Sequence, residues 1–407
     1  MIDRLDRKDC CGCMACINIC PRNCISLKYD REGFWYPDID KQACSECGRC
    51  EQVCPSLQAD ECESNFDFEI YGAWCKNEDV RFSSSSGGVF TVLAEYIIEQ
   101  GGVVFGAKAG PGGEIIHSCA TTKAGVREFR KSKYVQSNTG DAYREAKKYL
   151  VQGRTVLFSG TPCQIMALNR FLGKEYDNLY LVDVICVGVS SPGVWNAYLR
   201  QLEKENGDKI SNVIFRHKEI DEKVLKSGQR NLTMKITFSN GKILYQYHDE
   251  NMFFDGFLNK LYLRPSCAEC KAKNFKSGSD IQLGDFWEIE GMYPEVLELS
   301  RDGRRIPFGI SEVLLFTDKG RKLFYNIRKE LHSFRTDKEL VRTVQKDGNW
   351  YLLISSSQPH WNRERFFEEY NNNPADVYHI IAQNLNLRNL EYLSGMKIGM
   401  WGSYTGL

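Results

Sequence analysis

The sequence has no long apolar segment and no excess charge of either sign. Its longest apolar run, near Leu179–Val189, is interrupted by Asp183 and falls well short of the roughly 20 residues that a membrane-spanning helix needs. Lys and Arg together number 53, as do Asp and Glu, so no bulk charge attracts the chain to nucleic acid or to an anionic membrane. The N-terminal stretch MIDRLDRKD lacks the apolar core of a signal peptide. We therefore expect a cytoplasmic protein with no membrane span and no nucleic-acid partner.

Histidine is also scarce. The 6 histidines are scattered along the chain and form no Ser/His/Asp or Cys/His pattern, which argues against hydrolysis by a nucleophilic side chain. The sequence indicates no catalytic acid or base. Apart from one cysteine-rich pair near the N-terminus, it contains no internal repeat and no low-complexity segment.

Cysteine, by contrast, is abundant. The chain has 17 cysteines and no export signal, a combination that favours metal sites in a reducing compartment over disulfides. Within Cys10–Pro55 the pattern C-x2-C-x2-C-x3-C-P occurs twice, which is the spacing of bacterial ferredoxins with two 4Fe–4S clusters. The cysteines of the first run are Cys10, Cys13, Cys16 and Cys20, and those of the second run are Cys44, Cys47, Cys50 and Cys54.

In ferredoxins of this type, the fourth cysteine of each run ligates the cluster of the other run. The first cluster is thus expected on Cys10, Cys13, Cys16 and Cys54, and the second on Cys44, Cys47, Cys50 and Cys20. The alternative is zinc, which two C-x2-C pairs can bind, although zinc does not explain the two C-P endings. Cys11 and Cys24 fall outside the spacing and are predicted to be small core residues, and the segment Ile25–Asp40 between the runs is predicted to form a hairpin.

The rest of the chain alternates short apolar runs with amphipathic helical patterns, which is typical of an α/β fold. Buried strands are expected at Val103–Ala109, Arg154–Ser159 and Leu179–Cys186, and a hairpin at Asn231–His248. We predict an α/β protein, α+β overall, in which a larger mixed α/β domain with a largely parallel sheet follows the ferredoxin domain. The expected segments are the ferredoxin domain (1–57), a polar linker (58–69), two parts of the larger domain (70–152 and 153–345), a helical tail (346–395) and the start of a further, truncated domain (396–407).

Four further cysteines occupy positions suited to ligating a metal. Cys163 begins a predicted helix, Cys186 ends a buried strand, and Cys267 and Cys270 form a C-x2-C pair. A helix start favours a thiolate, and side chains at the strand ends of an open α/β sheet can meet in one cleft. The residues alone leave two interpretations open: a third cluster site, or two buried apolar cysteines beside a small zinc or redox pair.

Several motifs in this part of the chain occur together in a known family. In order they are SSGGVFTVLAEYII, KSKYVQS, GTPCQIMAL, DVICVGVSSPGVW and CAECKAKNFKSGSDIQLGDFW. Over about residues 70–345 the chain thereby resembles the coenzyme F420 hydrogenase/dehydrogenase beta-subunit family. The resemblance implies a domain that binds FAD beside one 4Fe–4S cluster, with ligands that would be Cys163, Cys186, Cys267 and Cys270 here. Where the family usually has a histidine after the second of these cysteines, this chain has Val187, which affects proton delivery and leaves ligation intact.

Candidate contacts to the flavin come from three segments. The small residues Ser84–Gly88 precede a helix and could bind a pyrophosphate through N–H groups, although an ordinary loop and helix cap has the same composition. The basic KSKY segment could hold phosphate or the edge of the isoalloxazine, or it is simply solvated, and the acid in LGDFW is either a polar contact or a turn residue. The candidates are Ser85, Ser86, Gly87, Gly88, Lys131, Lys133, Tyr134 and Asp285.

These patterns predict an iron–sulfur flavoprotein oxidoreductase, suited to an anaerobe. Single electrons would pass between a ferredoxin or another redox protein and FAD through three 4Fe–4S clusters, and FAD would exchange electron pairs with a small-molecule or deazaflavin (coenzyme F420-like) acceptor. The alternatives are an electron-transfer subunit with no substrate of its own, and a zinc-bearing scaffold. The segment Met396–Leu407 is weakly similar to the start of polysaccharide pyruvyl transferases, which would link the subunit to cell-surface polysaccharide biosynthesis.

Overall fold

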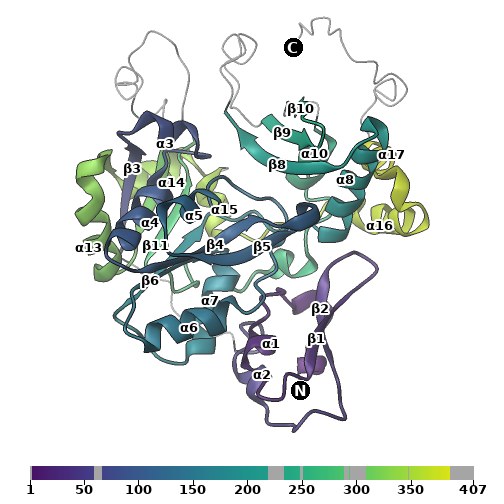
Figure 1. Ribbon diagram of the computed structural model, residues 1–407, viewed down its shortest axis with the longest axis horizontal. Coiled ribbons are helices and arrows are strands. Elements are labelled where there is room, and N and C mark those ends of the chain that lie inside the picture. The colour runs from purple at the N-terminus through teal and green to yellow at the C-terminus, as the bar shows by residue number, and fades with distance from the viewer. Residues whose placement is uncertain are drawn as a thin grey trace, which may run out of the picture.

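The structure is a computed structural model that describes residues 2–58, 67–218, 233–247, 251–287, 293, 309–346 and 348–385. A small N-terminal domain, purple in Figure 1, lies below a larger mixed α/β domain. This arrangement confirms the predicted fold class. Most of the predicted linker, the last part of the predicted helical tail and all of 396–407 lie outside the described residues.

The N-terminal domain is made of short elements around the two cysteine runs. Its two strands form the predicted hairpin, in which Tyr29 pairs with Trp35 in antiparallel register. The Asp30 carboxylate closes the turn, because it accepts hydrogen bonds from the backbone N–H groups of Glu32 and Phe34. The elements are η1 (Ile2–Arg4), η2 (Arg7–Asp9), α1 (Ala15–Ile19), β1 (Ile25–Tyr29), β2 (Trp35–Ile39) and α2 (Arg49–Gln52).

The larger domain is centred on an eight-stranded sheet, counted over the part of the chain that the structure describes. Its strand order is β13-β3-β12-β11-β7-β6-β4-β5. The strands are β3 (Glu69–Cys75), β4 (Val103–Ala109), β5 (Ile115–Ala120), β6 (Val156–Gly160), β7 (Leu179–Val184), β11 (Ile281–Asp285), β12 (Ser311–Leu315) and β13 (Leu331–Thr336).

The expectation of a largely parallel sheet is wrong. The pairs β4–β6, β6–β7 and β7–β11 are parallel, whereas β4–β5, β11–β12, β12–β3 and β3–β13 are antiparallel. A helix between two strands indicates parallel neighbours only where the strands are adjacent. Here β3 lies between β12 and β13 and is antiparallel to both. The strand–helix–strand pattern therefore gives no parallel pair at that edge.

Helices cover both faces of this sheet. Apolar residues of α4 (Val89–Glu99) and α13 (Asp318–Ile327) pack on one face, and those of α6 (Ala142–Val151) and α7 (Pro162–Leu172) pack on the other. Because strand side chains alternate between faces, β4, β6 and β7 each contribute residues to both cores. The remaining short helices around the sheet are α3 (Glu78–Phe82), η3 (Pro111–Gly113), α5 (Lys123–Arg127), η5 (Pro265–Glu269), η6 (Arg328–Glu330), α14 (Lys338–Val344) and α15 (Asn349–Ile354).

A second sheet lies at the top of Figure 1, in the order β10-β9-β8. It contains the predicted hairpin, now placed at β9 (Thr233–Phe238) and β10 (Ile243–Gln246), together with β8 (Ile210–His217). An aromatic core joins it to the neighbouring helices, which are α8 (Pro192–Asn206), α10 (Met252–Leu258), α16 (Arg363–Asn372), η7 (Pro374–Asp376) and α17 (Val377–Asn384). Of the helices formed by described residues, none combines the length and apolar character that crossing a bilayer demands.

Candidate cluster and cofactor sites

The cysteine runs of the N-terminal domain line two separate cavities. One is lined by Cys10, Cys13, Cys16 and Cys54, and the other by Cys20, Cys44, Cys47 and Cys50. Each cavity therefore contains three cysteines of one run, the fourth cysteine of the other, and one cysteine outside the spacing, which is Cys11 in the first cavity and Cys24 in the second. The structure brings together the two crossed sets that the spacing predicts, and we name them the first set and the second set.

The two sets differ in their surroundings. Cys13 and Cys54 of the first set are buried, and apolar side chains such as Ile2 and Trp35 line the same cavity. In the second set Cys47 is exposed. Polar side chains line this second cavity, namely Arg22, Ser45, Glu46 and Arg49. The second set therefore reaches the surface at Cys47, although its Cys20 is buried, while the first set has no exposed cysteine.

The four remaining candidate ligands, which we name the third set, come from three segments. Cys163 lies in the first turn of α7, which follows β6 and is closed by a capping box of Thr161 and Gln164. Cys186 follows β7, the parallel neighbour of β6. Because the carboxyl ends of parallel neighbours lie at one edge of the sheet, these two cysteines are brought side by side.

The Cys267–Cys270 pair reaches the same edge through η5. The backbone N–H of Arg264, the residue before η5, donates to the Val189 carbonyl at 2.9 Å. This hydrogen bond joins η5 to the segment after β7. At Gly188 a Cβ atom would lie 3.4 Å from the Cys267 sulfur, so the two segments are in contact. The predicted convergence of distant segments at the strand ends is what the structure shows.

The thiols of the third set disfavour ionisation of one another. Burial raises the pKa of Cys186 to about 12, and Cys163 and Cys270 add to the rise, while the nearby Lys273 ammonium opposes it. Burial also raises the pKa of Cys267, with Cys186 and Cys270 again contributing. Metal ligation requires thiolates. A cationic iron–sulfur core would stabilise the thiolate forms that burial and mutual repulsion disfavour here. Among the described residues, no three Cys, His, Asp or Glu side chains are arranged to hold a single metal ion.

Cys11 connects the third set to the first. Its side chain lines the first cavity and packs against the core of α6 and α7, and its thiol raises the pKa of Cys163, although the sequence predicts only a core residue. We name the six cysteines of this region the thiol junction: Cys11, Cys13, Cys163, Cys186, Cys267 and Cys270.

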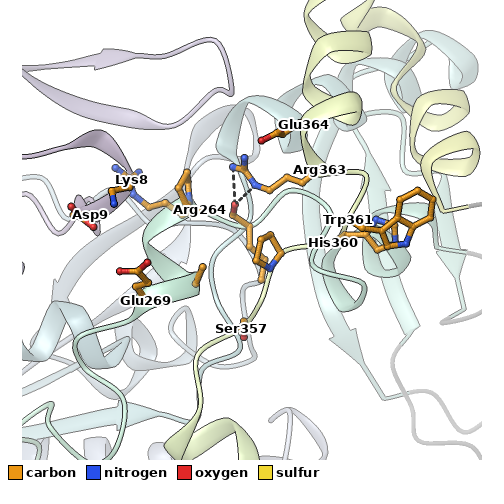
Figure 2. A pocket seen from close by; sticks show the side chains of 13 residues that line it. Lys8, Asp9, Arg264, Glu269, Ser357, His360, Trp361, Arg363 and Glu364 are labelled. Carbon is orange, nitrogen blue, oxygen red and sulfur yellow. Dashed lines mark hydrogen bonds between the residues drawn. The ribbon is translucent and has the colours of Figure 1, made fainter.

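Arg264 holds the N-terminal domain in place at this junction. It is 1% exposed, and it donates to the Cys10 carbonyl at 2.6 Å, to Gln136 Oε1 at 2.8 Å and to the Trp35 carbonyl at 2.9 Å. Figure 2 shows Arg264 near Lys8 of the N-terminal domain. Sequence reasoning missed this arginine, because its partners are distant in the chain and mostly backbone carbonyls.

The tail also contacts the η5 segment. The Cys270 N–H donates to Ser356 Oγ at 3.1 Å, and the Ser357 N–H donates to the Cys267 carbonyl at 3.3 Å. Gln358 Nε2 donates to the Ala268 carbonyl at 3.4 Å. The segment before α16 therefore braces the loop that carries two cysteines of the third set. No hydrophobic or ligand pattern in the sequence indicates this role.

The candidate flavin contacts converge on an arginine that the sequence analysis did not select. Arg216, in β8, donates to Tyr134 Oη at 3.1 Å and to Asp285 Oδ2 at 2.9 Å. It also donates to the Ser85 carbonyl at 3.4 Å. Three predicted contacts from three separate segments thus meet at one guanidinium. The signal that could have found it is the basic stretch FRHK within an apolar segment.

Cationic side chains crowd around this point, and we name Lys131, Arg216, Lys218 and Lys235 the cation cluster. Burial lowers the pKa of Lys218 to about 6, and repulsion from Arg216 contributes. Burial also lowers the pKa of Lys131 to about 8, helped by Lys235 and Arg216. Arg216 Nε and His217 Nδ1 are buried without a hydrogen-bond partner. The Lys218 ammonium donates to the carbonyls of Arg81 and Ser86, so an anionic group, such as the pyrophosphate of FAD, would supply negative charge to the set and an acceptor to Arg216.

Other candidates make hydrogen bonds within the protein. The Gly87 N–H donates to Ser311 Oγ at 3.0 Å, and Ser86 Oγ donates to the Ile310 carbonyl at 2.7 Å. The Lys133 ammonium donates to the carbonyls of Glu128, Phe129 and Arg130, which is a structural role. Gly88 adopts a left-handed conformation with a φ of 86° before α4, and no side-chain hydrogen bond caps that helix. Phosphate contact in this segment would therefore depend on the first-turn N–H groups of α4.

Comparison with known proteins agrees with this chemistry. Residues 9–57 match the family model of the 4Fe–4S dicluster domain. Residues 70–143 and 153–337 match the N-terminal and C-terminal models of the coenzyme F420 hydrogenase/dehydrogenase beta subunit. The fold and the cysteine sets thus define an iron–sulfur protein of the electron-transferring oxidoreductase class. The chain belongs to the coenzyme F420 hydrogenase/dehydrogenase beta-subunit family and carries a 4Fe–4S dicluster domain at its N-terminal side.

Two individual proteins are also similar. Ketoisovalerate oxidoreductase subunit VorC of Methanothermobacter marburgensis is 34% identical over 59 residues, which are 14% of this chain and 75% of that protein. A chain of the F420-reducing nickel–iron hydrogenase complex from Methanosarcina barkeri superposes with a TM-score of 0.42 and 14% sequence identity, over 80% of this chain and 94% of that chain.

Proposed function

We propose that this chain is a cytoplasmic iron–sulfur flavoprotein oxidoreductase. It would pass electrons between a ferredoxin-type donor and FAD through three 4Fe–4S clusters, and between FAD and a small-molecule or deazaflavin acceptor. The observation that supports this proposal concerns one edge of the eight-stranded sheet. The carboxyl ends of β6, β7 and β11 lie at this edge because the three strands are parallel neighbours, and β3 ends there too because it runs against β12, as β11 does.

The third set and the cation cluster are neighbours at that edge. Val184 of β7 pairs with Leu283 of β11, so Cys186 and Asp285 each lie two residues beyond a paired position on adjacent strands. Asp285 in turn binds Arg216 of the cation cluster. An anionic cofactor on the cation cluster would therefore lie close to the third set. FAD, when bound, would supply the two-electron chemistry, while Arg216 and Lys131 would hold its anionic part.

The second candidate is an electron-transfer subunit that acts on a partner enzyme and has no substrate of its own. It is favoured by the similarity of 59 residues of the chain to VorC, which is itself named a subunit of an oxidoreductase. The proposed link to cell-surface polysaccharide biosynthesis depends on residues 396–407, which lie outside the described residues.

The test is cofactor analysis followed by an anaerobic assay of the full chain. Protein purified without oxygen should contain about twelve iron atoms, four for each cluster, and about one FAD. A value near eight iron atoms would refute the third cluster, and absence of flavin would refute the flavoprotein. Reduction of coenzyme F420 by reduced ferredoxin would support the proposed oxidoreductase with its own substrate. Rapid flavin reduction without turnover of coenzyme F420 or other small acceptors would support the second candidate, an electron-transfer subunit.

A further inference from the structure

Two cysteines of the N-terminal domain belong to no ligand set, and their neighbours differ. Cys24 lies with its sulfur 3.4 Å from that of Cys20 and packs in a core formed by residues of the N-terminal domain alone. Cys11 lines the cavity of the first set and packs against the core that α6 and α7 form in the larger domain, where its thiol raises the pKa of Cys163 of the third set. Only one of these two cysteines therefore bridges two domains.

We propose that Cys11 is a positioning residue that couples the first set to the third, so that electrons cross between the domains at Cys13 and Cys163 and are exchanged with the redox partner at the second set. This inference rests on the proposed function, because it presupposes a cluster on the third set. In the crossing, the iron of the first set loses one electron and the iron of the third set gains one. No bond forms or breaks.

The backbone around Cys11 is fixed to the larger domain. Gln136 Nε2 donates to the carbonyls of Cys11 and Gly12, each at 3.3 Å, and Thr139 Oγ1 donates to the Cys13 carbonyl at 3.1 Å. Gly12 has a φ of 68°, and a Cβ atom there would lie 2.2 Å from Gln136 Nε2. The loop can therefore pack against the larger domain only with glycine at this position. This packing holds Cys11 beside Cys163.

The second set is placed for exchange with a partner. Its cavity is lined by residues of the N-terminal domain alone, and Cys47 is exposed. Cys13, in contrast, belongs to the core formed by α6 and α7, and Figure 1 shows α1 next to these helices. An electron donor that docks on the N-terminal domain therefore has access to the second set, while the first set faces the larger domain.

The experiment compares anaerobic full-length Cys11→Ala, Cys11→Ser and Cys24→Ala by iron analysis and by EPR after reduction with dithionite. All three should keep the iron content of the wild type. The EPR signals of the wild type should show magnetic coupling of the third cluster to the first. Cys11→Ala should weaken this coupling and slow reduction of the third cluster by an order of magnitude. Cys11→Ser retains a side chain of similar size, so it should stay close to the wild type, as should Cys24→Ala.

Four outcomes would overturn the proposal. Loss of iron in Cys11→Ala would make Cys11 a ligand, and an unchanged coupling and rate in that variant would make it an ordinary core residue. In the wild type itself, which needs no variant to fold, pulsed EPR should find the third cluster nearer to the first cluster than to the second, and the reverse order would refute the route. About eight iron atoms per chain in the wild type would refute a cluster on the third set, and the inference with it. About twelve iron atoms per chain, with no effect of Cys11→Ala, would refute the inference alone.

Discussion

The thiol junction and the cation cluster are neighbouring regions with opposite electrostatic imbalances. In the thiol junction, burial and mutual repulsion raise the pKa of Cys186 to about 12. In the cation cluster, burial and mutual repulsion lower the pKa of Lys218 to about 6. Both shifts persist although the Lys273 ammonium opposes the first and the Asp285 carboxylate opposes the second. The comparison indicates that each is completed by a bound group, iron–sulfur cores for the thiols and an anion for the cations.

The two regions are also held together differently. The thiol junction is fixed largely by backbone hydrogen bonds, such as those that the Cys270 N–H and the Cys267 carbonyl make with Ser356 and Ser357. The cation cluster depends on side-chain contacts around Arg216, with Asp285 as the acidic partner. Removal of one ligand from the thiol junction should therefore remove a whole cofactor, whereas a change in the cation cluster should shift an affinity.

The largest effect is expected from Cys270→Ala, which removes one ligand of the third set. Iron should fall from about twelve to about eight atoms per chain, and FAD should remain bound because the cation cluster is unchanged. Reduction of the flavin by a ferredoxin-type donor should slow by orders of magnitude in stopped-flow measurements. Cys119→Ala, a change at a partly buried cysteine outside every set, is the control. Flavin reduction at the wild-type rate in Cys270→Ala would mean that the third cluster is structural.

The next effect tests whether the sets are crossed. Cys20→Ala should remove the second cluster, because Cys20 lines the cavity of Cys44, Cys47 and Cys50, and EPR should show the first cluster intact. Cys24→Ala is the matched control, since Cys24 lies beside Cys20 and lines the same cavity but falls outside the ligand spacing. Iron analysis should find no loss in the control. Loss of a cluster in Cys24→Ala with none in Cys20→Ala would show that the register of the ligands is wrong.

A smaller effect is expected on stability from Arg264→Met. The substitution leaves the Cys10 and Trp35 carbonyls and the Gln136 amide without their buried donor. Because hydrogen bonds to charged groups are worth about 1.5–3 kcal/mol each and loss of burial is partly offset by the methionine, we expect roughly 3 kcal/mol less free energy of unfolding in anaerobic denaturant titrations. Arg365→Met removes an exposed partner of Glu369 and should cost less than about 1 kcal/mol. Equal losses in the two variants would contradict the role of Arg264.

Much of this architecture could be predicted from local patterns. The cysteine spacing predicts which residues share the first and second cavities, because each run forms one tight loop. Strand ends predict the convergence of Cys163 and Cys186, since both follow buried apolar runs. The strand β4 has the predicted bounds Val103–Ala109, because its apolar run ends sharply at a Gly-Pro-Gly-Gly turn.

The rest could not be predicted, because it depends on contacts between distant segments. Insertion of β3 between β12 and β13 creates two of the antiparallel pairs, and no local pattern encodes that neighbour relation. Arg264 and Arg216 look like ordinary surface cations in the sequence, yet both are buried by segments far away in the chain. Cys11 has no motif of its own, and its bridging position appears only when the N-terminal domain is docked.

The smallest effect, a pH dependence of cofactor affinity, tests the cation cluster. The pKa of Lys131 is lowered to about 8 and that of Lys218 to about 6, whereas an ordinary lysine titrates near 10.4. A bound pyrophosphate favours the charged ammonium and so raises both values. From about pH 6 upward, binding must therefore be accompanied by proton uptake. FAD affinity should accordingly fall as the pH rises from about 6 through 8 and beyond.

For the cofactor-free protein, the free energy of unfolding should depend on pH with the opposite sign. Between the lowered pKa of Lys131, about 8, and the ordinary value, the unfolded chain binds more protons than the folded one, so the free energy of unfolding should rise with pH. Calorimetric titrations with FAD in buffers of different ionisation enthalpy measure the proton uptake directly. Lys131→Met should remove the part of the uptake centred near pH 8, and Lys148→Met, a change at an exposed lysine, should leave it intact. An affinity that does not change with pH would mean that the anion is bound elsewhere, because a phosphate on these lysines cannot avoid shifting their protonation.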